Sequence, residues 1–202
     1  MCMPVELDRL RLRFPIYGKY VPVDHGEPLY AALCTEQPKL HGLDGFIVSP
    51  IIQAEPLGKE LMLTHESHVY VQIPQTQLPL AVALAGKTYR IRQSSVRLGP
   101  PSISLIQPAA KLYSRFVTSK HAETEDDMGK KLNDYLIDME SHAKVQVQRR
   151  RIMMIHGKKV VGFGVLLANL EEEPSVRIQV DGIFGRRRYS AGVFLPASGM
   201  ER

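Results

Sequence analysis

Two histidines and a tyrosine lie close together in the first part of the sequence. His25 precedes a predicted helix, Tyr30 lies within that helix, and His41 follows soon after its end. Histidine can take or give a proton near neutral pH, which suits general acid–base catalysis. On an RNA phosphodiester, one such group takes the proton of the ribose 2′-OH and another protonates the departing 5′ oxygen. Because the 2′-OH is the nucleophile, this chemistry needs no metal ion.

Each of these histidines also has a structural interpretation, because a histidine at a helix end is often a cap or a surface residue. A metal site is not expected. His65 and His68 are three residues apart but have no companion ligands in a zinc-binding pattern. The two cysteines, Cys2 and Cys34, cannot form a disulfide framework or a zinc site by themselves. We therefore expect no metal and no other cofactor.

Basic residues are concentrated in the second half of the chain. The net charge is +5, from 26 Lys and Arg against 21 Asp and Glu, and residues 101–202 contribute most of the excess. Residues 144–159 contain no acid and six basic residues, namely Lys144, Arg149, Arg150, Arg151, Lys158 and Lys159. Clustered positive charge favours a polyanion partner, most simply a nucleic acid. A solvated basic face is the alternative that composition alone leaves open.

A second basic cluster lies in a glycine-containing segment. It combines Gly182 and Gly185 with the consecutive arginines Arg186, Arg187 and Arg188. Glycines let the backbone approach phosphates, and arginine contacts them with two parallel hydrogen bonds. The spacing excludes a dinucleotide-binding fingerprint and a phosphate loop of the Gly-Lys-Ser/Thr type. The alternative is an ordinary glycine-rich turn before the last strand.

Length and composition indicate an ordinary globular protein. The 202 residues allow one large domain or two of about 100 residues each. Hydrophobic residues make up 44% of the chain, which excludes a disordered or fibrous protein. No apolar run approaches the roughly 18 residues of a membrane span, and the first residues lack a signal-peptide core. A cytoplasmic protein without a membrane partner is expected.

The second half shows the clearer pattern of elements. Strands are predicted at 111–119, 145–155, 159–168 and 188–195, and helices at 123–140 and 171–183. A turn at His156, Gly157 and Lys158 joins the two central strands as a hairpin. The order β-α-β-β-α-β is that of the ferredoxin-like unit, which many RNA-binding domains share.

The first half fits the same order. Strands are predicted at 5–14, 46–53, 60–64, 68–73 and 88–98, and helices at 27–37 and near 76–84. Gly99, Pro100 and Pro101 form a natural boundary. The predicted fold is therefore α+β, with two tandem ferredoxin-like (RRM-like) domains at residues 1–99 and 100–202.

Short motifs are spread along nearly the whole chain. They comprise Pro22 to Leu33, Pro38 to His41, Leu84 to Lys87, Arg149 to Arg151, Val161 to Phe163, and the glycine-rich element that runs to Phe194-Leu195-Pro196. The last of these resembles the signature loop of the CRISPR repeat-processing endoribonucleases, the Cas6 family. The others are similar to one branch of that family, often found in cyanobacterial and myxobacterial systems. Their order and spacing together make the resemblance specific.

The resemblance implies two ferredoxin-like domains and metal-independent cleavage at the base of a repeat hairpin, leaving a 2′,3′-cyclic phosphate and a 5′-OH. In relatives the catalytic histidine often follows the first helix, and a tyrosine lies within that helix. These positions match His41 and Tyr30, while His25 is the competing candidate because its segment also belongs to the branch's pattern. Phe184 and Ser190 stand where the branch usually has glycine, which puts the loop's phosphate contacts in question.

Three functions follow from these observations. The first is an endoribonuclease that matures CRISPR transcripts and stays on the hairpin within a Cascade-type complex, beside other Cas subunits. In this hypothesis Arg149, Arg150, Arg151 and Lys158 contact the RNA stem, and the glycine-rich loop contacts phosphates. The second is a non-cleaving subunit that only holds the hairpin. The third, an unrelated tandem RNA-recognition protein, is disfavoured because no strand carries the aromatic stacking signature.

Overall fold

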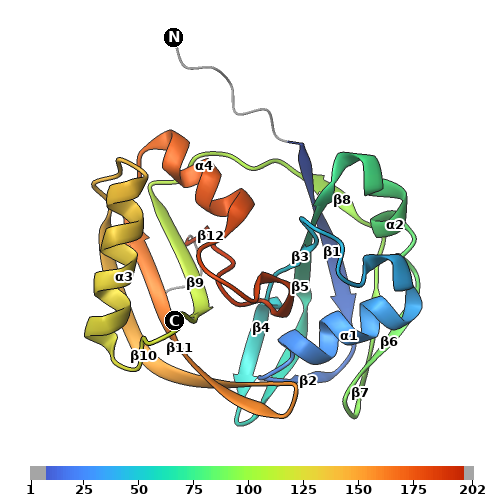
Figure 1. The fold of residues 1–202 in the computed structure, drawn as a ribbon. Coiled ribbons are helices and arrows are strands. Elements are labelled where there is room, and N and C mark those ends of the chain that lie inside the picture. Colours follow the sequence, from blue (N-terminus) through green and yellow to red (C-terminus); the bar gives the residue numbers. More distant parts are fainter. Residues whose placement is uncertain (1–7, 198–202) are drawn as a thin grey trace. The chain divides into compact units, whose positions relative to one another are not determined.

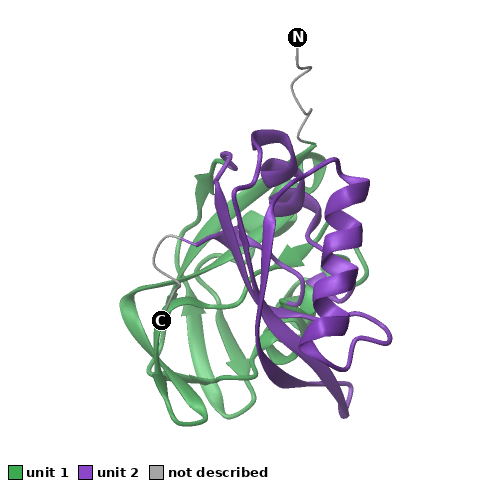
Figure 2. Cartoon of the chain, turned by 90° about the vertical axis from the view of Figure 1, so that its left-hand side faces the viewer, with its two compact units in different colours: residues 1–105, 188–190 green, residues 106–187, 191–202 purple. Residues whose placement is uncertain are grey.

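The computed structural model describes residues 8–197 and divides the chain into two compact units, coloured separately in Figure 2. One unit comprises residues 1–105 and 188–190, and the other comprises residues 106–187 and 191–202. Each unit has its own sheet and its own core, so the α+β class is confirmed. The division falls a few residues after the boundary expected at 99–101. The reason is strand β8 (Ser102–Ser104), which pairs with β1 (Arg9–Tyr17) of the first unit.

The sheet of the first unit is built around β1 and a long partner strand, β5 (Glu60–Pro74). The hydrogen-bonded order is β2-β5-β1-β7-β6, with β3 and β4 also pairing with β5. The remaining strands are β2 (Tyr20–Pro22), β3 (Ile47–Val48), β4 (Ile52–Leu57), β6 (Thr88–Ile91) and β7 (Ser94–Leu98). Residues 5–7 of the first predicted strand lie outside the described part of the chain.

The core of the first unit lies between this sheet and two helices, α1 (Gly26–Glu36) and α2 (Leu78–Val82) (Figure 1). Every second residue of β1 enters the core, and Leu12, Phe14 and Ile16 are almost completely buried. Leu29 and Leu33 of α1 pack against the same core. Short 3-10 turns follow α1 at Pro38–Leu40 (η1) and precede α2 at Gln75–Gln77 (η2).

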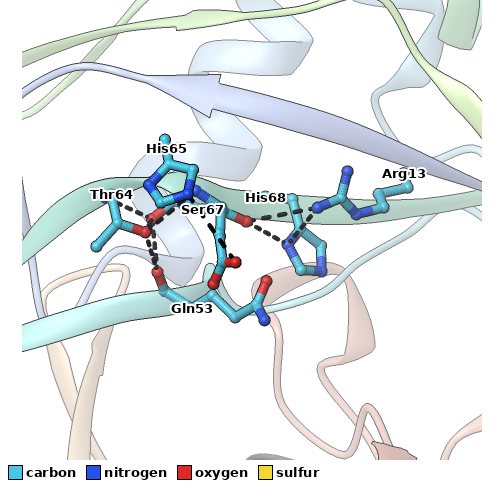
Figure 3. Close-up of polar contacts among 7 residues, drawn as sticks. Arg13, Gln53, Thr64, His65, Ser67 and His68 are labelled. Carbon is cyan, nitrogen blue, oxygen red and sulfur yellow. Dashed lines mark hydrogen bonds and ion pairs between the residues drawn. The ribbon is translucent and has the colours of Figure 1, made fainter.

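Strand β5 is continuous, whereas the sequence predicts separate strands at 60–64 and 68–73. The polar residues between them, which favour a turn, form a bulge against β4 (Figure 3). Gln53 has a positive φ, and its carbonyl oxygen accepts hydrogen bonds from the hydroxyls of Thr64 and Ser67, both at 2.8 Å. These bonds tie the extra residues of the bulge to β4, so β5 continues past the bulge. A similar polar turn, with Arg92 at positive φ, splits the predicted strand 88–98 into β6 and β7.

The second unit follows the predicted β-α-β-β-α-β order, with its four strands hydrogen-bonded in the order β10-β11-β9-β12. Its elements are β9 (Lys111–Val117), α3 (Glu125–Asp138), β10 (Lys144–Ile155), β11 (Lys158–Ala168), α4 (Glu172–Asp181) and β12 (Leu195–Pro196). Thr124 and Asp127 form a capping box that starts α3. Leu132 and Leu136 of that helix pack with Ile178 of α4 against the sheet.

The predicted last strand at 188–195 is wrong except at its end. Residues 187–189 form a 3-10 turn (η3), and β12 begins only at Leu195. Positive φ angles at Arg186, Ser190 and Gly192 bend the chain repeatedly, which a strand cannot accommodate. The loop is closed by hydrogen bonds on both sides of Gly192, whose N–H donates to the carbonyl of Phe116 and whose carbonyl accepts from the N–H of Ile183.

Candidate active site

The structure brings Tyr30 of α1 beside the turn that carries His41. The Tyr30 hydroxyl accepts a hydrogen bond of 3.1 Å from the N–H of Gly42, the residue that follows His41. The rings of Tyr30 and His41 have centroids 6.1 Å apart, tilted by 43°. Tyr30 is buried, whereas the side chain of His41 is exposed at the end of η1. The imidazole of His41 is exposed, while the adjacent backbone is fixed by the hydrogen bond to Tyr30, and this arrangement suits proton transfer with a bound substrate.

The Tyr30 hydroxyl is part of the interior of the first unit. Burial raises its pKa, although the hydrogen bond from Gly42 offsets part of that effect, and Cys34 on the next turn of α1 is a further hydrogen-bond partner. The same surroundings raise the pKa of the Cys34 thiol, again through burial. Both groups therefore keep their protons at neutral pH. This geometry indicates that the Tyr30 hydroxyl fixes the position of the backbone at Gly42.

The other candidate histidine, His25, occupies a very different environment. It is 1% exposed and lies directly before α1. Its Nδ1 lies 3.0 Å from the carbonyl oxygen of Pro22, and its Nε2 accepts a hydrogen bond of 3.0 Å from the N–H of Ile51. Because Nε2 is an acceptor, Nδ1 must carry the proton, and the Nδ1–H group donates a hydrogen bond to the carbonyl oxygen of Pro22. Both ring nitrogens thus connect backbone segments of the first unit.

Three residues of the glycine-rich segment, Arg188–Ser190, belong to the first unit and lie against α1. The ring of Tyr189 meets that of Tyr30 edge-on, with centroids 5.3 Å apart and planes at 87°. The guanidinium carbon of Arg188 lies 5.9 Å from the centroid of the same Tyr30 ring. A Cβ atom on Gly26 would collide with the carbonyl group of Tyr189, so only glycine permits this approach. Sequence patterns did not link these residues to Tyr30.

The remaining loop residues predicted to bind RNA lie in the second unit. Gly182 ends α4 with a positive φ, and a Cβ there would meet the carbonyl of Gly192. Arg187 donates a hydrogen bond to the carbonyl oxygen of Asp181, whereas Arg186 and Gly185 are exposed. The three consecutive arginines therefore have three different environments.

Strands β10 and β11 carry the other basic cluster on a long ribbon, drawn in orange in Figure 1. His156 and Gly157, both with positive φ, form its two-residue turn. Pairing with β9 begins only at Phe163, so the part nearer the turn has two strands in the described chain. Arg149, Arg150 and Lys158 are exposed and Arg151 is half-buried. The predicted RNA-binding residues of this cluster are thus brought together on one ribbon.

Two features are absent from residues 8–197. No group of three or more His, Cys, Asp or Glu side chains in that range is placed to hold a metal ion. No helix there is long and apolar enough to cross a membrane.

Comparison with known proteins agrees with the resemblance seen in the motifs. The model of the Cas6 CRISPR family matches residues 10–199. The chain belongs to the Cas6 family. It is 34% identical over 185 residues to the CRISPR-associated endonuclease Cas6 of Myxococcus xanthus, a match that covers 92% of this chain and 80% of that protein.

Solved Cas6-type structures share the fold at low sequence identity. A CRISPR-associated protein Cas6 matches with a TM-score of 0.65 and 9% identity, over 93% of this chain and 99% of the other. A structure described as that of a Cas6-related gene from Pyrococcus furiosus matches with a TM-score of 0.63 and 11% identity, over 93% and 98%. Thermus thermophilus Cse3, solved bound to an RNA representing a pre-cleavage complex, gives 0.51 and 12%, over 94% and 98%.

Proposed function

We propose that this Cas6-family chain is a metal-independent endoribonuclease that cuts CRISPR precursor RNA at the base of the repeat hairpin. Family membership supports this proposal, since the Myxococcus relative is described as an endonuclease and the Thermus Cse3 structure contains a pre-cleavage RNA. The expected products are a 2′,3′-cyclic phosphate and a 5′-OH. In this proposal both units are variants of the ferredoxin-like fold.

The observation that carries the proposal is the exposed His41 on a turn held by Tyr30. The neutral imidazole of His41 takes the proton of the 2′-OH, and the 2′ oxygen forms a bond to the adjacent phosphorus. The bond from phosphorus to the 5′ oxygen then breaks, and water supplies the proton to that oxygen. Every atom of this step comes from RNA, His41 and solvent, so no metal ion takes part.

Tyr30 and His25 have supporting roles in this scheme. The Tyr30 hydroxyl is buried and bonded to Gly42, so we assign it to positioning the His41 turn rather than to contact with RNA. His25 is buried with both ring nitrogens on the backbone, which leaves no route to a ribose hydroxyl. Its role is to fix the start of α1.

The RNA is held by the basic residues of both clusters. Arg149, Arg150, Arg151 and Lys158 on the β10–β11 ribbon face the phosphates of the hairpin stem, because A-form RNA is recognised mainly through its backbone and shape. Gly182, Gly185 and the arginines that follow contact further phosphates of the repeat RNA. The protein remains on its product hairpin in the cytoplasm, within a Cascade-type complex with other Cas subunits.

A second candidate function is a subunit that binds the hairpin without cutting it. It is favoured by Phe184 and Ser190, which have positive φ angles of 62° and 63° at positions where the family branch usually has glycine. Side chains at such angles are strained, so the loop is less free to adapt to a phosphate. A loop altered in this way is compatible with retained binding and lost cleavage.

The two functions are separated by incubating the protein with its repeat RNA in EDTA. The endoribonuclease cleaves and leaves a 2′,3′-cyclic phosphate, and cleavage stops when deoxyribose replaces the ribose upstream of the scissile phosphate. An unaltered RNA that is bound but remains intact supports the non-cleaving subunit instead. Cleavage of the deoxyribose RNA at the normal rate would contradict the proposed nucleophile.

A further inference from the structure

The arginines at 186, 187 and 188 are adjacent in sequence but have separate tasks in the structure. Arg187 is bound to the carbonyl oxygen of Asp181 in the second unit, and Arg186 is exposed in the same unit. Arg188 belongs to the first unit and lies 5.9 Å from the centroid of the Tyr30 ring. His41 lies 6.1 Å from the centroid of that ring. Of the three arginines, Arg188 is the one that has the Tyr30 ring as a neighbour, as the candidate base His41 also does.

The short segment that carries Arg188 is fixed to the first unit by its neighbours. Tyr189 is half-buried and packs against the hydrophobic core, with its ring edge-on to Tyr30. Ser190 is 4% exposed and has a positive φ, and the residues from Ala191 onward belong to the second unit. Gly26 leaves room for the Tyr189 carbonyl. These contacts fix the backbone of residues 188–190, while the Arg188 side chain remains exposed. A fixed backbone and an exposed side chain are typical of a ligand-binding residue.

The charge of the proposed reaction indicates what that ligand is. A phosphodiester carries one negative charge, and attack by the 2′ oxygen adds a second to the phosphorane as the 2′ proton passes to His41. A guanidinium can donate two parallel hydrogen bonds to the non-bridging oxygens and stabilise this added charge. A fixed donor aimed at developing charge lowers a barrier more than one that binds substrate and transition state equally.

We propose that Arg188 is a catalytic residue whose guanidinium contacts the non-bridging oxygens of the scissile phosphate, since Arg188 and His41 are both neighbours of the Tyr30 ring. This inference rests on the proposed endoribonuclease function and deepens it. The bond from the 2′ oxygen to phosphorus forms and the bond to the 5′ oxygen breaks, as above. Arg188 keeps its proton throughout and supplies only charge and hydrogen bonds. Arg186 has no part in this step.

The test compares single-turnover cleavage by the wild-type protein, Arg188→Ala, Arg188→Lys and the control Arg90→Ala. Arg90 is an exposed arginine on β6 and is not among the proposed catalytic or RNA-binding residues. Arg90→Ala therefore removes the same single positive charge as Arg188→Ala. At saturating protein we expect Arg188→Ala to cut about 100-fold or more slowly, with RNA affinity changed far less. Lysine, which lacks the two-pronged geometry, restores part of the rate, and Arg90→Ala cleaves like the wild type.

A sulfur substitution at the scissile phosphate supplies a readout that a structural role does not affect. Sulfur accepts hydrogen bonds poorly, so replacing the contacted non-bridging oxygen slows the wild type. Arg188→Ala has no such contact to lose, and its oxygen and sulfur substrates react at similar rates. An Arg188→Ala protein that cleaves at the wild-type rate, or that keeps the full sulfur effect, overturns this inference while leaving the nuclease proposal intact. A wild-type protein that does not cleave overturns the proposed function itself.

Discussion

The hydroxyl of Tyr30 accepts a hydrogen bond from the backbone N–H of Gly42, twelve residues later in the chain. This single bond links the first helix to the turn that carries His41. A buried aromatic ring thereby fixes the backbone beside an exposed imidazole. The arrangement separates two tasks, since Tyr30 sets the position and His41 remains free to meet a substrate.

Replacing Tyr30 with phenylalanine removes the hydroxyl and keeps the ring. We expect the single-turnover cleavage rate to fall about 10-fold or more while RNA affinity is unchanged, because misplaced catalytic groups lose rate rather than binding. The matched control is Tyr89→Phe, since the Tyr89 hydroxyl is also buried and donates to the carbonyl of Leu84. Both variants lose about 1 kcal/mol of stability, but only Tyr30→Phe slows cleavage. Equal rates for the two variants would remove the positioning role.

Gly26→Ala should displace the segment that carries Arg188. The new Cβ collides with the carbonyl of Tyr189, whereas Gly185→Ala meets no atom within 4 Å. We expect Gly26→Ala to lower the melting temperature and Gly185→Ala to leave it near the wild-type value, as calorimetry would show. If both melt alike, the close approach of Tyr189 to α1 is wrong.

Glu171 gives a pH dependence whose sign is fixed by its partners. Its carboxylate accepts hydrogen bonds from the Ser141 hydroxyl and the His142 N–H, which lower its pKa to about 2. Because this folded-state pKa lies below the ordinary value of 4.5, its stabilisation is complete above that value and is lost as the pH falls toward 2. Thermal melts of wild type and Glu171→Gln should differ most at pH 7 and converge in acid. A difference that grows in acid would contradict this assignment.

The basic ribbon should control the salt dependence of RNA binding. Changing Arg149, Arg150 and Arg151 together to alanine removes up to three phosphate contacts. We expect weaker binding, and the slope of log affinity against log salt should become shallower by up to about 3. Arg90→Ala, a single exposed arginine on β6, should leave the slope unchanged. If the triple variant keeps the wild-type slope, the ribbon is a solvated surface.

Much of the second unit could be predicted from sequence, because its periodic patterns and turn residues agree. The helical spacing of Leu132 and Leu136, and the His156-Gly157 turn, both have the predicted structure. The final strand could not be predicted, since its β-forming residues suit a strand while the backbone takes positive φ at Ser190 and Gly192. In this segment the packing of Tyr189 against the core of the first unit outweighs the local preference for a β-strand.

The site was predictable in its residue types but not in their contacts. The sequence indicates His41, His25 and Tyr30 as candidates, yet it does not distinguish a buried histidine from an exposed one. The buried Nε2 of His25 accepts its hydrogen bond from Ile51, which is distant in the chain. Similarly, no sequence pattern singles out Arg188 from its two neighbours, because the difference arises from which unit each arginine joins.

The most direct test of the central claim is the single-turnover cleavage rate of His41→Ala on the repeat RNA in EDTA, measured at saturating protein. His41 is exposed, so the variant should fold and bind RNA as the wild type does. We predict a rate lower by about 100- to 10,000-fold, the usual contribution of a general base, with unchanged affinity and melting temperature. A His41→Ala protein that cuts the RNA at the wild-type rate would contradict the account.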